Sequence, residues 1–220
     1  MTAYKLIMIF SNDTAEKTAE LLLSIKAVKL SPQQPFTWSS GWKSPIYCDN
    51  RITLSYPEIR TFIKEKFTEI IREKFTSAEM IAGVATAGIA HGAILAEHVE
   101  SPFCYVRSSS KGHGLGNRIE GLVLPNQKVL VVEDLISTGG SSLSVVDALR
   151  EAKTEVIGLI AIFTYGFPIA EKKFGDSGIP FYTLTDYETL LRAALKQGTI
   201  RNEELETLQQ WRRSPETWGA

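Results

Sequence analysis

Four short apolar runs alternate with stretches of helical periodicity in the second half of this chain. The runs are MIAGVA (80–85), FCYV (103–106), KVLVVED (128–134) and VIGLIAIF (156–163), and helical segments are expected at about 88–98, 140–152 and 169–174. Strands are apolar at consecutive positions, not alternate ones, when helices cover both faces of a parallel sheet. The pattern therefore predicts an α/β fold with a doubly wound, mainly parallel sheet.

The residues before this core do not show the alternation of apolar runs and helical segments. Residues 13–26 predict an amphipathic helix capped by Asn12 or Asp13, and Pro57 opens a second long helix that runs to about Lys74. Between them the stretch PFTWSSGWKSPIYCDNR (35–51), called the hood here, is rich in aromatic and turn residues and predicts a hairpin or an extended segment. We expect an N-terminal helix and small hood in 1–56, an α/β core in 57–185, and closing helices in 186–220, at roughly 186–196 and 201–212.

Charge and cysteine usage exclude several classes of partner. With 24 basic and 25 acidic residues the net charge is −1, so no general field attracts nucleic acid or an anionic membrane, and any anion must be bound locally. The longest early apolar run, Leu6 to Phe10, is too short for a signal peptide core or a spanning helix. Cys48 and Cys104 are isolated from each other and from any metal-binding spacing. We expect a cytoplasmic protein with inert thiols and no nucleic-acid or membrane partner.

One strand end combines two acids with a loop that suits an anion. Glu133 and Asp134 close the run at 128–134, and the small-residue turn from Ser137 to Ser141, called the phosphate loop here, precedes a helix. Free backbone N–H groups at a helix N-terminus bind phosphate, although an ordinary capped strand-turn-helix has the same look. Adjacent carboxylates are costly unless they are solvated, paired with a cation or bonded to hydroxyls. The ligand is therefore expected to carry a phosphate at one end and hydroxyls or a metal at the other.

Two further loops follow neighbouring strands, and ligands of such sheets bind outside the carboxyl ends of the strands. GVATAGIAHG (83–92) places Gly83 and Gly88 where backbone N–H groups could surround an anion, but tight strand–helix packing explains the glycines equally well. His91 and His98 on the following helix have no acidic or cysteine partners, which favours packed or surface histidines over metal ligands.

The third loop, RSSSKGHGLGNR (107–118), is called the lid here. It contains Arg107, Lys111, His113 and Arg118 and no acid. It is either a solvated basic loop or a flexible lid that closes over a highly charged anion and excludes water. Together the three loops specify a phosphorylated ribose that carries a diphosphate.

At this point a family resemblance is visible. VLVVEDLISTGGS resembles the phosphoribosyl-diphosphate motif of type I phosphoribosyltransferases, which has a hydrophobic strand, two acids and a Ser/Thr/Gly phosphate loop. The hood resembles that of orotate phosphoribosyltransferases, with the pattern Phe-Thr-x-x-Ser-Gly-x-x-Ser-Pro, and RSSSKGHG resembles their Arg-x3-Lys-x-His lid. The matches run along most of residues 30–165, so the chain is similar to the orotate phosphoribosyltransferase family.

The resemblance implies transfer of the phosphoribosyl group from 5-phosphoribosyl 1-diphosphate to orotate, giving orotidine 5′-monophosphate and pyrophosphate in pyrimidine synthesis. It also implies a Mg²⁺ requirement and a homodimer in which the lid of one subunit covers the site of the other. The ion would be held mainly by substrate, near Glu133 and Asp134. The residues that the resemblance implicates in catalysis are Arg107, Lys111, His113 and Asp134. Besides these four, donor binding would involve Glu133, Leu135, Ile136, Ser137, Thr138, Gly139, Gly140 and Ser141, and orotate binding would involve Ser137, Phe36 and Lys43.

Departures from the family pattern leave one contact open. Some members carry lysine where this chain has Ser39, Ala87 or Ser108, and some carry an arginine near the position of Tyr165. The partner of the orotate carboxylate is therefore not determined by the sequence. Two alternatives remain: a purine-specific phosphoribosyltransferase of the same fold, and a regulator that senses phosphoribosyl diphosphate and binds nucleic acid.

Overall fold

The central element of the computed structural model, which describes residues 7–38, 40–107 and 118–219, is a seven-stranded sheet. Its strand order is β1-β11-β10-β9-β6-β7-β8, and every neighbouring pair is parallel except β7 with β8. The strands are β1 (Ile7–Ile9), β6 (Met80–Val84), β7 (Phe103–Val106), β8 (Ile119–Glu120), β9 (Lys128–Ile136), β10 (Glu155–Thr164) and β11 (Phe181–Asp186).

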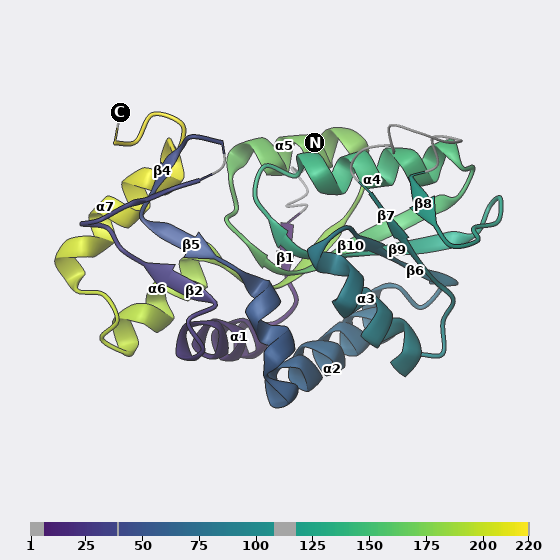
Figure 1. Ribbon diagram of the computed structural model, residues 1–220, viewed down its shortest axis with the longest axis horizontal. Helices are drawn as coiled ribbons and strands as arrows, with labels where there is room; N and C mark the ends of the chain where they lie inside the picture. The colour runs from purple at the N-terminus through teal and green to yellow at the C-terminus, as the bar shows by residue number, and fades with distance from the viewer. Residues whose placement is uncertain (1–6, 39, 108–117, 220) are drawn as a thin grey trace.

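Helices cover both faces of this sheet (Figure 1). On one face lie α1 (Asn12–Ser24), α2 (Pro57–Lys74) and α3 (Ala87–His98), and on the other lie α4 (Gly140–Glu151) and α5 (Pro168–Ser177). Alternate residues of β9 enter the two cores: Leu130 and Val132 belong to the first, Val129 and Val131 to the second, and all four are fully buried. The predicted doubly wound α/β sheet is confirmed, and its physical basis is that both faces of the strands are buried.

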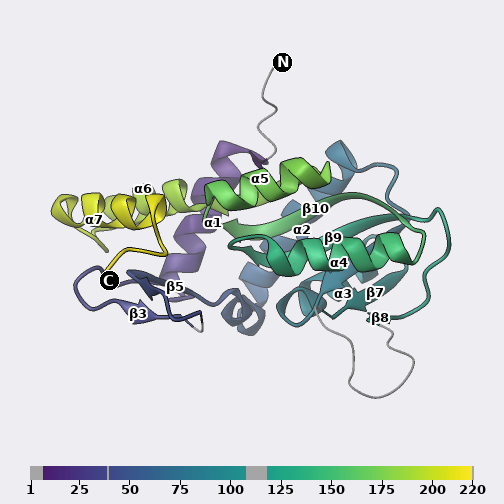
Figure 2. The same cartoon turned by 90° about the horizontal axis from the view of Figure 1, so that it is seen from above.

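The hood and the C-terminal helices form a second region beside the sheet. The hood contains β3 (Phe36–Thr37) paired antiparallel with β4 (Lys43–Ser44), and β5 (Ile46–Cys48), which pairs with β2 (Val28–Leu30). A 3-10 helix, η1 (Asn50–Ser55), connects β5 to α2. Both views show α6 (Tyr187–Lys196) and α7 (Asn202–Arg213) alongside the hood strands (Figure 2).

Two side chains of α7 attach this region to the sheet. Trp211 Nε1 donates a hydrogen bond to the Lys43 carbonyl (3.1 Å), and Arg212 Nε donates to the Tyr165 carbonyl at the end of β10 (3.1 Å). The Trp211 ring packs at centroid distances of 5.4–5.6 Å against four buried or half-buried rings, those of Trp38, Tyr165, Phe167 and Tyr187. The C-terminal helices, to which no function could be assigned from the sequence, therefore support the hood.

The observed elements differ from the predicted ones in a few places. Helix α2 has the predicted bounds, but α1 is capped by Ser11, whose side chain accepts from Thr14 N, so neither Asn12 nor Asp13 is the cap. Strand β9 continues to Ile136, two residues beyond the predicted end, so the two acids lie within the strand. The strands β1, β8 and β11 were not predicted, and β1, from the segment assigned to 1–56, pairs with β11 in the central sheet.

Replacing Trp211 with alanine is expected to lower the free energy of unfolding by about 3–5 kcal/mol, because a fully buried aromatic ring leaves a cavity. Equilibrium unfolding in urea measures the change. The matched control is Arg213→Ala on the exposed side of the same helix, which should stay within about 0.5 kcal/mol of the parent. Equal effects of the two substitutions would contradict the supporting role of α7.

Candidate active site

The strand order reverses direction between β6 and β9. From β6 the chain proceeds to β7 on one side, whereas β9, β10 and β11 extend the sheet on the other side. Open α/β sheets bind ligands at such a switch point, outside the carboxyl ends of the strands. Here those ends carry the segment before α3 and the phosphate loop, so two of the three predicted loops are adjacent in space.

The phosphate loop has the backbone of an anion site. Gly139 has φ 75° and stands at the N-terminus of α4, and a Cβ atom there would meet the Phe174 ring at 2.8 Å. No side chain caps α4, and its first turn contains no acid. Its N-terminal N–H groups and the positive end of its dipole therefore remain suited to an anion.

The glycines of the 83–92 loop serve close packing. A Cβ on Gly88 would lie 2.5 Å from the Val132 carbonyl oxygen, and one on Gly83 would lie 2.9 Å from the Gly88 carbonyl oxygen. Any side chain at either position would separate α3 from β6 and β9. The packing interpretation of these glycines is supported, and the predicted contact of this loop with an anion stays a prediction.

The two adjacent acids occupy different environments. Glu133 is 5% exposed, and its Oε1 accepts from the Asp134 backbone N–H (3.0 Å) while its Oε2 accepts from Ser142 Oγ (3.1 Å). Burial, reinforced by the neighbouring charge of Asp134, raises the pKa of Glu133 well above its ordinary value. Burial also raises the pKa of Asp134, although that residue is only half-buried. Glu133 is thus buried with both oxygens hydrogen-bonded within the protein, whereas Asp134 is more accessible to a ligand.

A cavity of about 630 Å³ lies between the hood and the phosphate loop. It is lined by Thr37, Trp38, Ser40, Trp42, Tyr47, Cys48, Leu135, Ser137, Thr138 and Tyr165. The predicted residues Leu135, Ser137 and Thr138 therefore face the same cavity as the hood aromatics.

Two predicted orotate contacts are not among the residues that line this cavity. Lys43 is exposed, and its Nζ donates to Thr37 Oγ1 (2.9 Å). The Phe36 ring packs against Tyr47 with centroids 5.7 Å apart. Four other lining residues were not predicted: Thr37, Ser40, Cys48 and Tyr165. Neither hydrophobic periodicity nor a motif shows which residues of the irregular hood, or of the segment after β10, line a cavity.

The lid is described only at its two ends, and Lys111 and His113 lie outside the described residues. Arg107 Nη2 forms an ion pair with Glu120 Oε1 (3.1 Å) on the adjacent strand β8. Arg118 Nε donates to the Arg107 carbonyl (2.9 Å), and its Nη2 donates to the carbonyl and the hydroxyl of Ser144 on α4 (2.8 Å each). The ends of the lid are therefore fixed to the core beside the helix that follows the phosphate loop.

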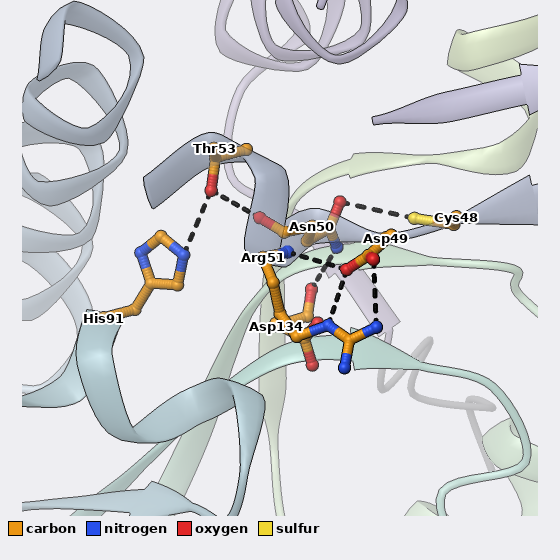
Figure 3. Close-up of polar contacts among 7 residues, drawn as sticks. All are labelled: Cys48, Asp49, Asn50, Arg51, Thr53, His91 and Asp134. Carbon is orange, nitrogen blue, oxygen red and sulfur yellow. Dashed lines mark hydrogen bonds and ion pairs between the residues drawn. The ribbon is translucent and has the colours of Figure 1, made fainter. Parts of the chain in front are cut away.

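A buried polar network, absent from the predictions, reaches the acidic pair from the hood side (Figure 3). Asn50 is fully buried, and its Nδ2 donates to the Asp134 carbonyl oxygen (2.7 Å). Thr53 Oγ1 lies 3.2 Å from His91 Nε2, so the predicted packed role of His91 is confirmed. The sequence carries no short-range signal for this network, because 84 positions separate Asn50 from Asp134.

Fold and site together define a phosphoribosyltransferase of the type I class, with an acidic strand end, a phosphate loop and a hooded cavity at the switch point. In agreement, residues 51–180 match the phosphoribosyl transferase domain family. The chain is 56% identical to an orotate phosphoribosyltransferase of Bacteroides fragilis over 91% of this chain and 94% of that protein. It is 54% identical to the Bacillus subtilis orotate phosphoribosyltransferase over 90% of this chain and 92% of that protein.

A solved structure agrees with these relatives. The crystal structure of orotate phosphoribosyltransferase from Aeropyrum pernix superposes with a TM-score of 0.73 at 27% identity, covering 83% of this chain and 99% of that one. The chain therefore belongs to the orotate phosphoribosyltransferase family, as its hood and lid motifs predicted. The reaction of the family forms orotidine 5′-monophosphate from orotate and phosphoribosyl diphosphate. Among the described residues, no helix is long and apolar enough to cross a membrane.

The buried acid generates a prediction about pH. Because the folded-state pKa of Glu133 is raised, ionising this residue costs stability at pH values above its unfolded pKa, and the cost disappears as the pH falls and the group is protonated in both states. Glu133→Gln keeps an acceptor for Asp134 N and a polar group beside Ser142. We expect its Tm to exceed the parent's at pH 8, by about 2–4 °C for each kcal/mol of unfolding free energy that is no longer lost to ionisation of Glu133.

The difference in Tm should shrink as the pH is lowered from 8 to 5. Scanning calorimetry of both proteins across this range measures it. The control is Glu155→Gln, which removes an exposed carboxylate and should follow the parent at every pH. A Glu133→Gln protein less stable than the parent at pH 8, with a gap that widens with pH, would contradict the burial argument.

Proposed function

We propose that this chain transfers the phosphoribosyl group to N1 of orotate in the cavity under the hood, with the 5-phosphate in the phosphate loop and the ribose beside Asp134. The observation that carries the proposal is that one cavity is shared: Ser137 and Thr138 of the phosphate loop line it together with Trp38 and Trp42 of the hood. A planar ring linked to a phosphorylated sugar matches this combination of an aromatic wall and an anion loop.

The base portion of the cavity offers neutral donors. The indole rings of Trp38 and Trp42 stack at a centroid distance of 6.4 Å and an interplanar angle of 20°. The residues with a hydroxyl group that line the cavity are Thr37, Ser40, Tyr47, Ser137, Thr138 and Tyr165. In this proposal these hydroxyls and backbone N–H groups receive the orotate carboxylate and carbonyl oxygens, in place of the charged residues found in some family members.

Arg212, which donates a hydrogen bond to the Tyr165 carbonyl, has another function. Arg212 donates from Nη2 to the Gly166 carbonyl (3.0 Å) and pairs through Nη1 with Glu188 (2.8 Å), besides its bond to the Tyr165 carbonyl. All three of its nitrogens are thus engaged in holding α7 to the end of β10. We therefore assign Arg212 to support of the cavity and not to orotate binding.

Departure of the diphosphate leaves a sugar with oxocarbenium character, so the reaction needs no protein nucleophile. The chemical requirement is stabilisation of negative charge on the leaving group, and one preorganised donor in such a position contributes about 3–4 kcal/mol. Lys111 and His113, which lie outside the described residues, are the proposed donors, with Arg107 at the fixed end of the lid. The reference pKa of His, near 6.5, suits donation of a hydrogen bond or a proton.

The described residues suit a metal carried in with the donor substrate. They contain no group of three or more His, Cys, Asp or Glu side chains arranged to hold a metal ion. Mg²⁺ favours a few carboxylate oxygens together with substrate phosphate oxygens. Asp134 is the carboxylate placed to assist, and the ion would neutralise charge on the diphosphate.

The function is tested by the loss of orotate absorbance when phosphoribosyl diphosphate and Mg²⁺ are added to the protein. Activity should disappear with excess chelator and return with Mg²⁺. Consumption of adenine or xanthine with orotate untouched would favour the purine-specific alternative. Salt-sensitive binding of nucleic acid without any turnover would favour the regulator.

Lys111→Ala is expected to lower kcat by two to three orders of magnitude, the loss associated with one donor at a site of developing charge. Steady-state kinetics of the purified variant measure the effect. Lys172→Ala, on an exposed position of α5, is the matched control and should keep the parental kcat. Near-parental turnover of Lys111→Ala would remove this lysine from the mechanism.

The proposed homodimer with a shared lid makes a quantitative prediction. An equimolar mixture of Lys111→Ala and Asp134→Asn proteins, exchanged through mild denaturation, should recover about a quarter of parental activity. Half of the dimers would be hybrids, and each hybrid would have one site with an intact Asp134 and an intact lid from its partner. Activity that stays at the level of the separate variants would indicate that the lid acts on its own subunit.

A further inference from the structure

The backbone of Asp134 lies where the central sheet loses a strand. The register between β6 and β9 runs from Met80–Val129 to Gly83–Val132, so β6 has ended before β9 reaches Asp134. Buried backbone N–H and C=O groups must find partners elsewhere when a neighbouring strand ends. At Asp134 both partners are side chains: Glu133 Oε1 accepts from its N–H, and Asn50 Nδ2 donates to its carbonyl oxygen.

The orientation of the Asn50 amide follows from its other contact. Cys48 Sγ lies 3.3 Å from Asn50 Oδ1, and a thiol donates to an oxygen acceptor, so the NH₂ group is the part of the amide that faces Asp134. Asn50 and its network partner Thr53 are both fully buried. Loss of the Asn50 amide would therefore leave the Asp134 carbonyl without its side-chain donor.

The 3-10 helix that carries Asn50 is itself fixed to α3. Thr53 Oγ1 donates to the Asn50 carbonyl (2.5 Å), so this hydroxyl is left to accept from His91 Nε2–H (3.2 Å) (Figure 3). Burial, with Arg60 nearby, lowers the pKa of His91 to about 4, so the ring is neutral at pH 7 and carries the proton on Nε2. The chain of contacts runs from α3 through Thr53 and Asn50 to β9, and it joins three elements around the switch point.

We propose that Asn50 is a positioning residue for phosphoribosyl transfer. Its amide donates the hydrogen bond that a neighbouring strand would otherwise provide to the Asp134 carbonyl. This bond fixes the backbone of Asp134, and with it the carboxylate that receives the ribose. The inference rests on the role proposed for Asp134 above. A residue that acts in this way affects the donor half of the reaction. The cavity under the hood, where the base binds, is lined by other side chains.

The experiment is a double-mutant cycle with Asn50→Ala and Asp134→Asn, read as kcat/KM for phosphoribosyl diphosphate. We expect Asn50→Ala to lower this value about tenfold, by analogy with the lower end of the losses seen for residues that orient metal ligands. The KM for orotate should change less than twofold. Once Asp134 has lost its carboxylate, adding Asn50→Ala should lower kcat/KM less than twofold further.

Two further variants serve as controls. Asn202→Ala removes an exposed amide from α7 and should leave all constants at parental values. Asn50→Ser keeps a smaller donor and should recover part of the lost kcat/KM, and it replaces the alanine variant in the cycle if that protein does not fold by circular dichroism. A purely structural role would lower Tm and impair the use of both substrates alike, which would overturn the proposal.

The positioning role of Asn50 and the ribose role of Asp134 can fail separately. If Asp134→Asn impairs the enzyme and the Asn50 substitution multiplies that loss by its full single-variant factor, the positioning role is wrong while the ribose role of Asp134 stands. If Asp134→Asn has parental kcat/KM, the proposed ribose role itself is wrong, and the positioning role falls with it.

Discussion

The site depends on a difference in length between two neighbouring strands. Strand β9 continues past the last residue of β6 with which it pairs, so the segment around Asp134 has a strand partner on the β10 side only. A parallel sheet would normally satisfy the exposed backbone groups with another strand, which would also cover the ligand side. Here two side chains satisfy them, and the carboxyl edge of the sheet remains open for a ligand. Glu133 therefore supports the backbone at this edge, and its predicted contact with the donor stays a prediction.

The second requirement is that the hood keeps a fixed position relative to the carboxyl edge of the sheet. The hood strands are two or three residues long and cannot be rigid by themselves. They are supported by Trp211 and Arg212 on one side and by Asn50 on the other, which connect the hood to α7, β10 and β9. The result is a cavity whose aromatic wall and anion loop belong to parts of the chain about a hundred residues apart.

Much of this could be predicted from the sequence, because the relevant signals are local. Continuous apolar runs identified the core strands β6, β7, β9 and β10, Pro57 marked the start of α2, and the acids followed by small residues identified the phosphate loop. The missed strands of the central sheet are β1, with three residues, β8, with two, and β11, whose two threonines interrupt the apolar run. These strands are specified by pairing with a neighbour and not by their own pattern.

The same limit applies within the site. Lys43 and Phe36 were chosen by residue type, and the direction of their side chains depends on how β3 and β4 pair, so their contact with orotate stays a prediction. Asn50 could not be identified as a partner of Asp134, since only folding brings the Asn50 Nδ2 atom within 2.7 Å of the Asp134 carbonyl oxygen. The different environments of Glu133 and Asp134 likewise arise from burial against α4, which adjacent letters in a sequence do not reveal.

The most direct test of the account is a crystal structure with orotidine 5′-monophosphate bound. We expect the phosphate on the backbone N–H groups of Ser137–Ser141. The ribose hydroxyls should lie within hydrogen-bond distance of the Asp134 carboxylate, and the pyrimidine ring should lie beside Trp38. A phosphate bound elsewhere, a ring outside the hooded cavity, or ribose hydroxyls held by Glu133 in place of Asp134 would contradict the account.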